Sequence, residues 1–297
     1  MRPRPSDIPS AIDRAAGRRA TVDLSAADAV VVSSGSVLME GDGLAILPSV
    51  ARPESSIVVF LGTHEGRDVV AITIQEESPT LSAGILTPLR QAFSTLSLGG
   101  RAAEVELAAT AVAMIEWHGR HRVCPRCGAA TEPLHGGWML RCVAEGHEHY
   151  PRTDPAVIVA ITDERDRMLF AHVGYQPAGR YSHLAGYLEP GETLEQAAHR
   201  EVFEEASLRL FALQYVGSQP WPFPASIMVG FRAKANSADL KVDEVEVTDA
   251  RWMARDDLRA ALFDGSMRLA SPGTLSRNLV HDWYGGDPVA DAGVAGA

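Results

Sequence analysis

The spacing of apolar residues changes several times along the chain. Between residues 22 and 76, short apolar runs alternate with Gly, Asp and Ser turns, which is typical of strands. The runs are AVVVSSGSVLM, LAILPSV, SSIVVFLG and DVVAITIQ. Residues 102–121 are Ala-rich and apolar at helical spacing, so they predict a buried helix. We therefore expect a β-rich N-terminal domain over residues 1–120, closed by this helix.

Beyond Pro155, strand-like and helix-like segments alternate. AVIVAITDERDRMLFAHV predicts a hairpin that turns at Asp163 to Asp166, and LQYVGS and SIMVGFRAKA predict two further strands. RDDLRAALFDG predicts a later helix. These segments indicate an α+β domain over residues 153–285, whereas the Gly/Ala-rich end predicts a disordered tail over residues 286–297.

Another helix is predicted to begin near Leu194. Thr193 and Gln196 have the spacing of a capping box, which satisfies backbone N–H groups at a helix start. Leu194, Ala198 and Val202 follow at intervals of four residues, so they indicate one buried face.

The opposite face of this helix carries Glu201, Glu204 and Glu205. Like charges three or four residues apart on a helix destabilise it, and the chain already has a formal net charge of -11. Hard divalent cations such as Mg²⁺ take carboxylate oxygens together with substrate phosphates as ligands, and would turn this repulsion into coordination. The pattern predicts a cation site, with a solvated acidic face as the alternative.

The overall composition limits the function classes. An excess of 38 Asp and Glu over 27 Lys and Arg argues against an extensive nucleic-acid surface, so an RNA substrate would be held locally. No apolar run approaches the length of a membrane span, and the basic start lacks the apolar region of a signal peptide. We expect a cytoplasmic protein without membrane partners.

All three cysteines lie in one short window. Cys124 and Cys127 form a C-x2-C knuckle, and Cys142 follows at the distance of a zinc ribbon, which we place over residues 121–152. A structural zinc ion needs four ligands, and His147 is the nearest candidate for the fourth, with His149 second. The alternatives are three reduced thiols without metal, or a ribbon that also contacts nucleic acid.

The helix and the loop before it resemble the Nudix box. Residues 186–208, GYLEPGETLEQAAHREVFEEASL, match the pattern G-x5-E-x7-R-E-U-x-E-E-x-G-U at every defined position except one. Ser207 replaces the second Gly, which closes the helix where a positive φ favours glycine. The resemblance implies the Nudix fold, a mixed sheet between helices, and hydrolysis of a nucleoside diphosphate linked to another group.

The resemblance also implies roles for the charged residues of the box. Glu201, Glu204 and Glu205 would bind catalytic Mg²⁺ or Mn²⁺, and Glu204 or Glu205 would act as the base for water. Glu192 and Arg200 would form an ion pair between loop and helix.

A second motif narrows the substrate. SQPWPFPAS, residues 218–226, is similar to the array that marks NADH pyrophosphatases, a group that includes bacterial enzymes removing NAD caps from RNA. Its prolines stiffen a loop that presents two aromatic rings, which suits recognition of planar groups. The implied substrate contacts here are Gln219, Pro220, Trp221, Pro222, Phe223, Pro224, Ala225 and Ser226.

The resemblance extends to residues outside the two motifs. Tyr150, Tyr187 and Ser276 are implied substrate contacts. The carbonyl of Ala185 and the carboxylate of Glu246 are implied members of the catalytic metal site, with Glu244 as the rival of Glu246.

Together these features imply a metal-dependent NAD(+)/NADH diphosphatase with one structural zinc ion. It would split NAD(H) into AMP and nicotinamide mononucleotide, and would also act on NAD at RNA 5′ ends. Members of the family are commonly homodimers, so a homodimer is expected. The alternatives are a Nudix hydrolase of ADP-ribose, coenzyme A or diadenosine polyphosphates, and a non-catalytic zinc-ribbon module associated with RNA.

Overall fold

The structure is a computed structural model that describes residues 10–74 and 84–294. The described chain divides into two compact units. The N-terminal unit holds residues 10–153 together with Trp221–Ala225, and the C-terminal unit holds Asp154–Pro220 and residues 226–294. Gln75, the last residue of a predicted strand, lies outside the described residues.

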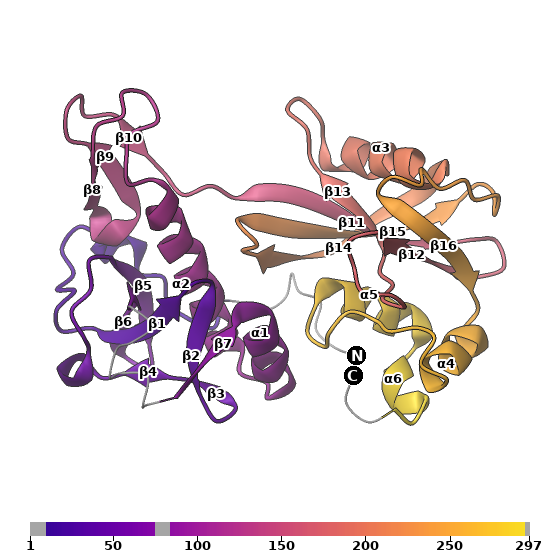
Figure 1. Ribbon diagram of the computed structural model, residues 1–297, viewed down its shortest axis with the longest axis horizontal. Helices are drawn as coiled ribbons and strands as arrows, with labels where there is room; N and C mark the ends of the chain where they lie inside the picture. Colours follow the sequence, from indigo (N-terminus) through magenta and orange to yellow (C-terminus); the bar gives the residue numbers. More distant parts are fainter. Residues whose placement is uncertain (1–9, 75–83, 295–297) are drawn as a thin grey trace. The chain divides into compact units, whose positions relative to one another are not determined.

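The N-terminal unit is built on a seven-stranded sheet (Figure 1), which agrees with the β-rich character that the apolar runs predict. Its path is β3-β2-β1-β6-β5, with β4 paired to β1 and β7 paired to β2. The strands are β1 (Asp28–Ser33), β2 (Ser36–Glu40), β3 (Gly43–Leu44), β4 (Ile46–Leu47), β5 (Val58–His64), β6 (Arg67–Thr73) and β7 (Ile85–Pro88). The central strand β1 is buried on both faces, which explains its continuous apolar run.

Two helices cover one face of this sheet. α2 (Ala102–Arg120) confirms the predicted helix, and it packs with α1 (Leu89–Leu98) against Val30 and Val32 of β1. Ala29 and Val31, which alternate with those valines, face a second core on the other side of the sheet. Short 3₁₀ turns complete the unit at η2 (Ala16–Arg18), η3 (Ser49–Ala51) and η5 (His135–Gly137).

A small sheet follows α2 within the same unit. It contains β8 (Thr131–Leu134), β9 (Met139–Cys142) and β10 (Glu148–His149) in the order β10-β9-β8. Its strands are antiparallel. This three-stranded sheet carries the cysteine segment.

The C-terminal unit is a mixed sheet between helices, which confirms the predicted fold class. The strand order is β14-β15-β11-β12-β16, with β13 paired to β11, and β11 runs parallel to β15. The strands are β11 (Asp154–Thr162), β12 (Met168–Val173), β13 (Leu184–Tyr187), β14 (Leu210–Trp221), β15 (Ser226–Ala235) and β16 (Val247–Met253). The predicted hairpin is present as β11 and β12, whose turn is held by the Asp163 carboxylate.

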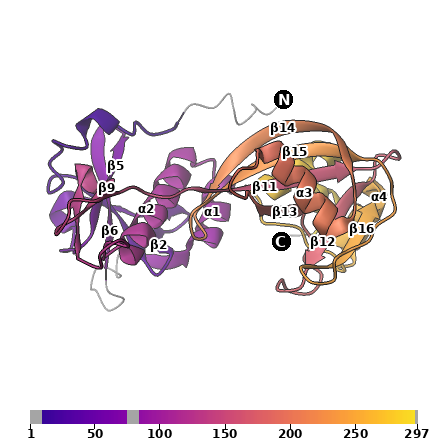
Figure 2. The same cartoon turned by 90° about the horizontal axis from the view of Figure 1, so that it is seen from above.

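Helices lie on both faces of this sheet. α3 (Leu194–Ala206) packs on the face that carries Val157 and Val159, and it overlies the strands in the view from above (Figure 2). α4 (Arg255–Phe263) and α5 (Leu275–Tyr284) pack on the face that carries Ile158 and Ala160. Because successive side chains of β11 point to opposite faces of the sheet, this strand contributes residues to both cores.

The chain end corrects our prediction of a disordered tail over residues 286–297. α6 (Pro288–Asp291) is helical, and the Asp287 carboxylate accepts the backbone N–H of Val289. Val289 and Ala292 are buried and join the core under α4 and α5. The prediction was wrong because it used only the Gly/Ala-rich composition, which does not show that Val289 and Ala292 pack into a core. Residues 295–297 lie outside the described residues.

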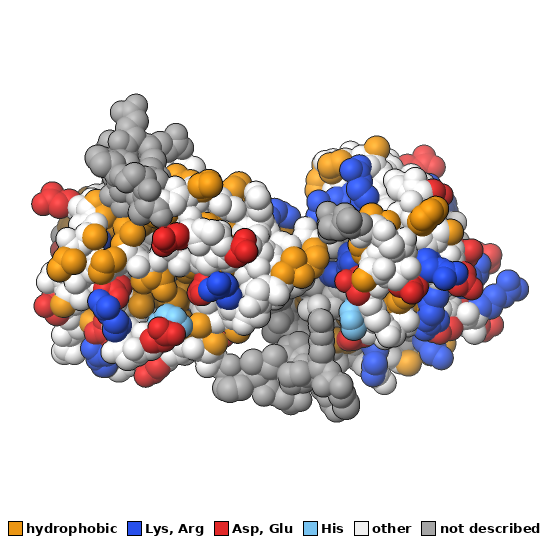
Figure 3. Space-filling view, turned by 90° about the horizontal axis from the view of Figure 1, so that it is seen from below, with side chains coloured by type: hydrophobic (Ala, Val, Ile, Leu, Met, Phe, Trp, Pro, Cys, Tyr) orange, Lys and Arg blue, Asp and Glu red, His pale blue; other side chains and the backbone are white. Residues whose placement is uncertain are grey.

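Charged side chains of both signs mix on the face of each unit seen in Figure 3. This face carries no broad basic field over the residues that the structure describes, in keeping with the acidic composition. None of the described helices is both long and apolar enough to cross a membrane.

Candidate functional site

The box helix α3 begins where the sequence predicts. Thr193 caps it: its hydroxyl accepts the backbone N–H of Gln196, and the Gln196 side chain accepts the backbone N–H of Thr193. Ala198 and Val202 are fully buried, which fixes the opposite, glutamate-bearing face towards β13 and the loop after it. Ser207 takes the left-handed conformation itself, with φ 56, so the helix ends as a glycine would end it.

Arg200 connects the loop to the glutamates. Its Nε lies 2.6 Å from Glu192 Oε1, and its Nη1 lies 2.9 Å from Glu201 Oε1 and 3.1 Å from Glu204 Oε2. Its Nη2 donates to the backbone carbonyl of Tyr187. The hydrogen bonds from Arg200 lower the pKa of Glu192 to about 2. The ion pair that the resemblance implies is therefore present, and it also positions two of the three glutamates.

Gly186 allows Glu201 to approach β13. A Cβ at Gly186 would lie 1.9 Å from the Glu201 carboxylate carbon. No side chain fits there without moving that carboxylate. The glycine that opens the box is thus required by a close approach.

Glu205 lies deepest in the cluster, at 5% exposure. Burial raises its pKa to about 8, and the negative charges of Glu201, Glu246 and Asp243 act in the same direction. Its Oε2 is buried and has no hydrogen-bond partner among the described residues. Burial also raises the pKa of Glu201, despite its bond to Arg200. A positive charge at this point would restore ionisation of both carboxylates.

The structure brings Glu246 to the same place. Glu244 and Glu246 are both exposed, and the negative charge of Glu246 raises the pKa of Glu201 and of Glu205. The geometry therefore favours Glu246 over its rival.

Asp243 belongs to the same cluster and was not predicted. Burial would raise the pKa of its carboxyl, but the backbone N–H groups that it accepts from Val247, Glu246 and Val245 outweigh that effect and lower it. The sequence feature that could have indicated Asp243 is its position in the acidic segment just before β16.

This arrangement suits a hard divalent cation. Only oxygen ligands are offered, the backbone of Ala185 lies at the cluster because it donates to Glu205, and a buried carboxylate oxygen lacks a partner. The side chain of Glu204 is 58% exposed and forms an ion pair with Arg200. The cluster can thus hold a cation between α3, β13 and the turn before β16.

A group of side chains that could hold a metal ion lies in the N-terminal unit. One ligand atom each from Cys124, Cys127, Cys142 and His147 lies within 4.8 Å of the others. His147 presents Nδ1, which lies 3.7 Å from Cys124 Sγ. Three thiols and one imidazole are the donors of a structural zinc site, and the zinc ribbon that we expect is present. His149 is not part of this group.

Zinc content tests this ligand set. His147→Ala should lose zinc to a mild chelator much faster than the parent chain, because a closed four-ligand site becomes a three-ligand site. The parent should hold about one zinc per chain, measured by atomic emission. His149→Ala is the matched control and should retain zinc. Loss of zinc in that control alone would identify His149, and not His147, as the fourth zinc ligand.

The aromatic motif loop packs within the N-terminal unit. Trp221 and Phe223 meet edge to face with ring centroids 4.9 Å apart, and Trp221 also contacts Phe93 of α1 at 6.4 Å. The guanidinium of Arg90 lies over both loop rings. Pro222 is buried, and the Phe223–Pro224 peptide bond is cis. The rings are therefore held in place before any substrate arrives.

The other predicted substrate contacts divide between the two units. Tyr150, in the N-terminal unit, is 61% exposed and donates to Glu148. Tyr187, in the C-terminal unit, is 53% exposed, and its hydroxyl lies 3.0 Å from that of Ser226. Ser276 is buried on α5, where its hydroxyl contacts Ser182. Gln219 bonds to the carbonyl of Gly273 and the N–H of Leu275, which fixes the start of α5.

Three protein families match successive parts of this chain. A NADH pyrophosphatase-like rudimentary NUDIX domain matches residues 22–117, a NADH pyrophosphatase zinc ribbon domain matches residues 120–150, and a NUDIX domain matches residues 152–271. A relative from Mycobacterium bovis, named NAD-capped RNA hydrolase NudC, is 36% identical over 266 residues, which cover 86% of this chain and 82% of the relative. The chain belongs to the NudC family of Nudix hydrolases.

Other similarities cover smaller parts of this chain. The human relative named NAD-capped RNA hydrolase NUDT12 is 36% identical over 192 residues, which are 61% of this chain and 42% of NUDT12. A solved NUDIX hydrolase from Nitrosomonas europaea has 21% sequence identity and a TM-score of 0.45, and the match covers 56% of this chain and 94% of that one.

Proposed function

We propose that this chain hydrolyses the pyrophosphate bond of NAD(H) to give nicotinamide mononucleotide and AMP, both from the free dinucleotide and from NAD at RNA 5′ ends. The observation that carries the proposal is the acidic cluster of Glu201, Glu205, Asp243 and Glu246, in which Glu205 is buried, and which calls for a cation beside a phosphate substrate. The intact SQPWPFPAS loop and the names of the NudC relatives support the choice of NAD over other dinucleotides.

The catalytic cation would be Mg²⁺ or Mn²⁺. The residues that would hold it are Glu201, Glu205 and Glu246, with the carbonyl of Ala185 and the nearby carboxylate of Glu204. When bound, such a cation offsets the negative charge of the pyrophosphate and lowers the pKa of water. Arg200 keeps Glu201 and Glu204 oriented towards this place.

Hydrolysis needs one proton acceptor. Water attacks one phosphorus of the pyrophosphate, the bond from that phosphorus to the bridging oxygen breaks, and two phosphate monoesters leave. The proton of the water passes to Glu204 or Glu205, the two carboxylates at the end of α3. Both glycosidic bonds stay whole.

The substrate contacts would come from two sets of side chains. Trp221 and Phe223, held by the surrounding prolines, would bind a planar ring of the dinucleotide. Tyr150, Tyr187 and Ser276 complete the proposed set, and Gln219 through Ser226 form the loop itself. Because Ser276 is buried and bonded to Ser182, we assign it to shaping the site through α5.

Product analysis tests the reaction. NADH and Mg²⁺ should yield AMP and reduced nicotinamide mononucleotide, separated by ion-exchange chromatography, and an NAD-capped RNA should yield a 5′-monophosphate RNA. Release of free nicotinamide, or a marked preference for ADP-ribose, coenzyme A or diadenosine polyphosphates, would contradict the proposal.

The loop is tested by Trp221→Ala. Stacking of a base on an aromatic side chain contributes roughly 1–3 kcal/mol, so kcat/KM for NADH should fall by roughly tenfold to a hundredfold. Hydrolysis of a small pyrophosphate without a second ring should fall less. Phe211→Ala, which removes an exposed aromatic ring from β14 outside the loop, is the control and should leave kcat/KM unchanged. Equal losses for both substrates would assign Trp221 a structural role through its contact with Phe93.

We also propose a reducing compartment such as the cytoplasm, because the three cysteines are free thiols and zinc binds them reduced. The homodimer that the family resemblance implies stays part of the proposal. Light scattering during size-exclusion chromatography would measure it.

A further inference from the structure

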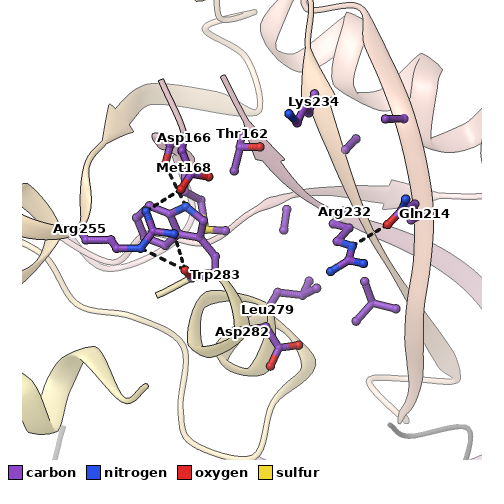
Figure 4. A pocket seen from close by; sticks show the side chains of 14 residues that line it. Thr162, Asp166, Met168, Gln214, Arg232, Lys234, Arg255, Leu279, Asp282 and Trp283 are labelled. Atoms are coloured by element: carbon purple, nitrogen blue, oxygen red, sulfur yellow. Dashed lines mark hydrogen bonds and ion pairs between the residues drawn. The ribbon is translucent and has the colours of Figure 1, made fainter. Parts of the chain in front are cut away.

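A hollow lies in the C-terminal unit, on the opposite face of the sheet from α3 (Figure 4). Its volume is about 350 Å³, within the range of small-molecule pockets. Strands β11, β14 and β15 form one side, and α5 forms part of the other. All of its lining residues belong to the C-terminal unit.

This hollow, which we call the β15 pocket, is separate from the glutamate cluster. Ala185 and Gly186 of that cluster pair with Ile158 and Val157 in the middle of β11. The pocket instead takes in Ala160 and Thr162 further along β11, and Ala160 belongs to the face of the sheet opposite α3. The proposed hydrolysis does not use this pocket.

Two cations line the strand side. Arg232 and Lys234 lie two residues apart on β15, so both project from the same face. Arg232 donates through Nε to Gln214, and its two Nη groups have no partner among the described residues. Lys234 forms no hydrogen bond or ion pair within the described ranges. The hollow therefore contains two positively charged side chains with hydrogen-bond donors that lack partners among the described residues, although the net charge of the chain is -11.

The helix side carries one open carboxylate. Asp282 of α5 lines the pocket, and it has no ion-pair partner in the described part of the chain. Arg255, in contrast, is fully engaged, because it pairs with Asp166 at 2.7 Å and donates to the carbonyl of Trp283. Figure 4 shows Arg255 fixed at the wall and Asp282 on a different side of the hollow from Arg232. The charged groups without an ion-pair partner among the described lining residues are therefore two cations and one carboxylate.

We propose that the β15 pocket binds a ribose phosphate unit. The planar guanidinium of Arg232 and the ammonium of Lys234 would hold the phosphate oxygens. The Asp282 carboxylate would accept hydrogen bonds from the ribose hydroxyls. The apolar side chains of Val216 and Leu279, which line the same hollow, leave room for a ring beside the sugar. This goes beyond the proposed hydrolysis, and the unit comes either from a free mononucleotide or from a nucleotide within an RNA chain.

Binding to the full-length, zinc-loaded chain tests the proposal without added Mg²⁺ or Mn²⁺. Ribose 5-phosphate, AMP and inorganic phosphate are titrated by calorimetry. The Arg232→Gln/Lys234→Gln double variant should weaken binding of ribose 5-phosphate at least tenfold. Asp282→Asn should weaken ribose 5-phosphate severalfold and leave inorganic phosphate unchanged. Arg259→Gln, on α4 and paired with Asp256 outside the pocket, is the matched control and should change nothing.

A short single-stranded RNA without a cap distinguishes the two sources. Binding at least tenfold tighter than AMP, and lost in the double variant, assigns the pocket to RNA; equal or weaker binding assigns it to free mononucleotides. No saturable binding of any probe, or affinities unchanged in the double variant, would overturn the proposal. NADH turnover is measured separately and should be the same in the double variant and the parent, so failure of the hydrolysis and failure of this site are distinguishable.

Discussion

Replacing Glu205 by glutamine should lower kcat for NADH by roughly 10²-fold or more, because it removes the buried charge at the centre of the acidic cluster. The amide keeps the shape of the side chain, so its packing at 5% exposure is retained. Initial rates with saturating Mg²⁺ measure the effect. Glu195→Gln, an exposed glutamate in the first turn of the same helix, is the matched control and should keep the parental rate. Near-normal turnover of Glu205→Gln would return this helix face to the role of a solvated acidic surface.

The stability of the same variant separates lost chemistry from lost folding. The folded-state pKa of Glu205 is about 8, above the ordinary value of 4.5. Its stabilising contribution is therefore present below pH 4.5 and is lost as the pH rises through 8. Without divalent cations, Glu205→Gln should gain thermal stability relative to the parent over this window, as measured by the melting temperature. A variant that is less stable at every pH would owe its lost activity to misfolding.

Local signals in the sequence were sufficient to predict helix α3. The capping box and the buried stripe depend on spacing within a few turns of chain, and the Glu192–Arg200 ion pair was implied by the resemblance to the Nudix box. The structure contains all three. The hairpin at Asp163 was predicted for the same reason. The apolar runs also predicted the β-rich N-terminal unit, because strands buried on both faces have no polar positions.

Features that depend on contacts between distant segments could not be predicted. Asp243 lies just before β16, and its charge acts on Glu205 because α3 packs against β16. The burial of Ser276 and the short strand β13 depend equally on tertiary packing. Short elements such as α1 and α6 have too few residues for a clear period, so only their buried contacts reveal them.

The packing of the motif loop is a further case. The sequence predicted that prolines would stiffen the loop, but it gave no indication that Trp221 and Phe223 contact Phe93 and lie under Arg90. These contacts join residues more than a hundred positions apart. Intrinsic stiffness and the packing on α1 therefore both hold the rings, and Trp221→Ala tests the two together.

Gly186→Ala should lower kcat by roughly 10²-fold while leaving the fold almost as stable as the parent. The added Cβ would lie 1.9 Å from the Glu201 carboxylate carbon, so one of the two must move. β13 is held by its pairing of Gly186 with Val157 in the sheet, whereas the carboxylate is the end of a flexible side chain. The carboxylate therefore moves, and it leaves both the acidic cluster and its 2.9 Å contact with Arg200. Gly286→Ala, at a glycine with open space around it, is the matched control.

A double-mutant cycle shows whether the loss acts through Glu201. Glu201→Ala alone should lower kcat by a similar factor, and adding Gly186→Ala to it should change kcat little, because the group that the new methyl displaces is already gone. The fall in kcat should appear with a small change in melting temperature, since the methyl meets a movable side chain and not backbone. Independent, multiplicative losses in the double variant would mean that Gly186 matters for the backbone of β13 itself. In that case the close approach to Glu201 would not be the reason for a glycine at the first position of the box.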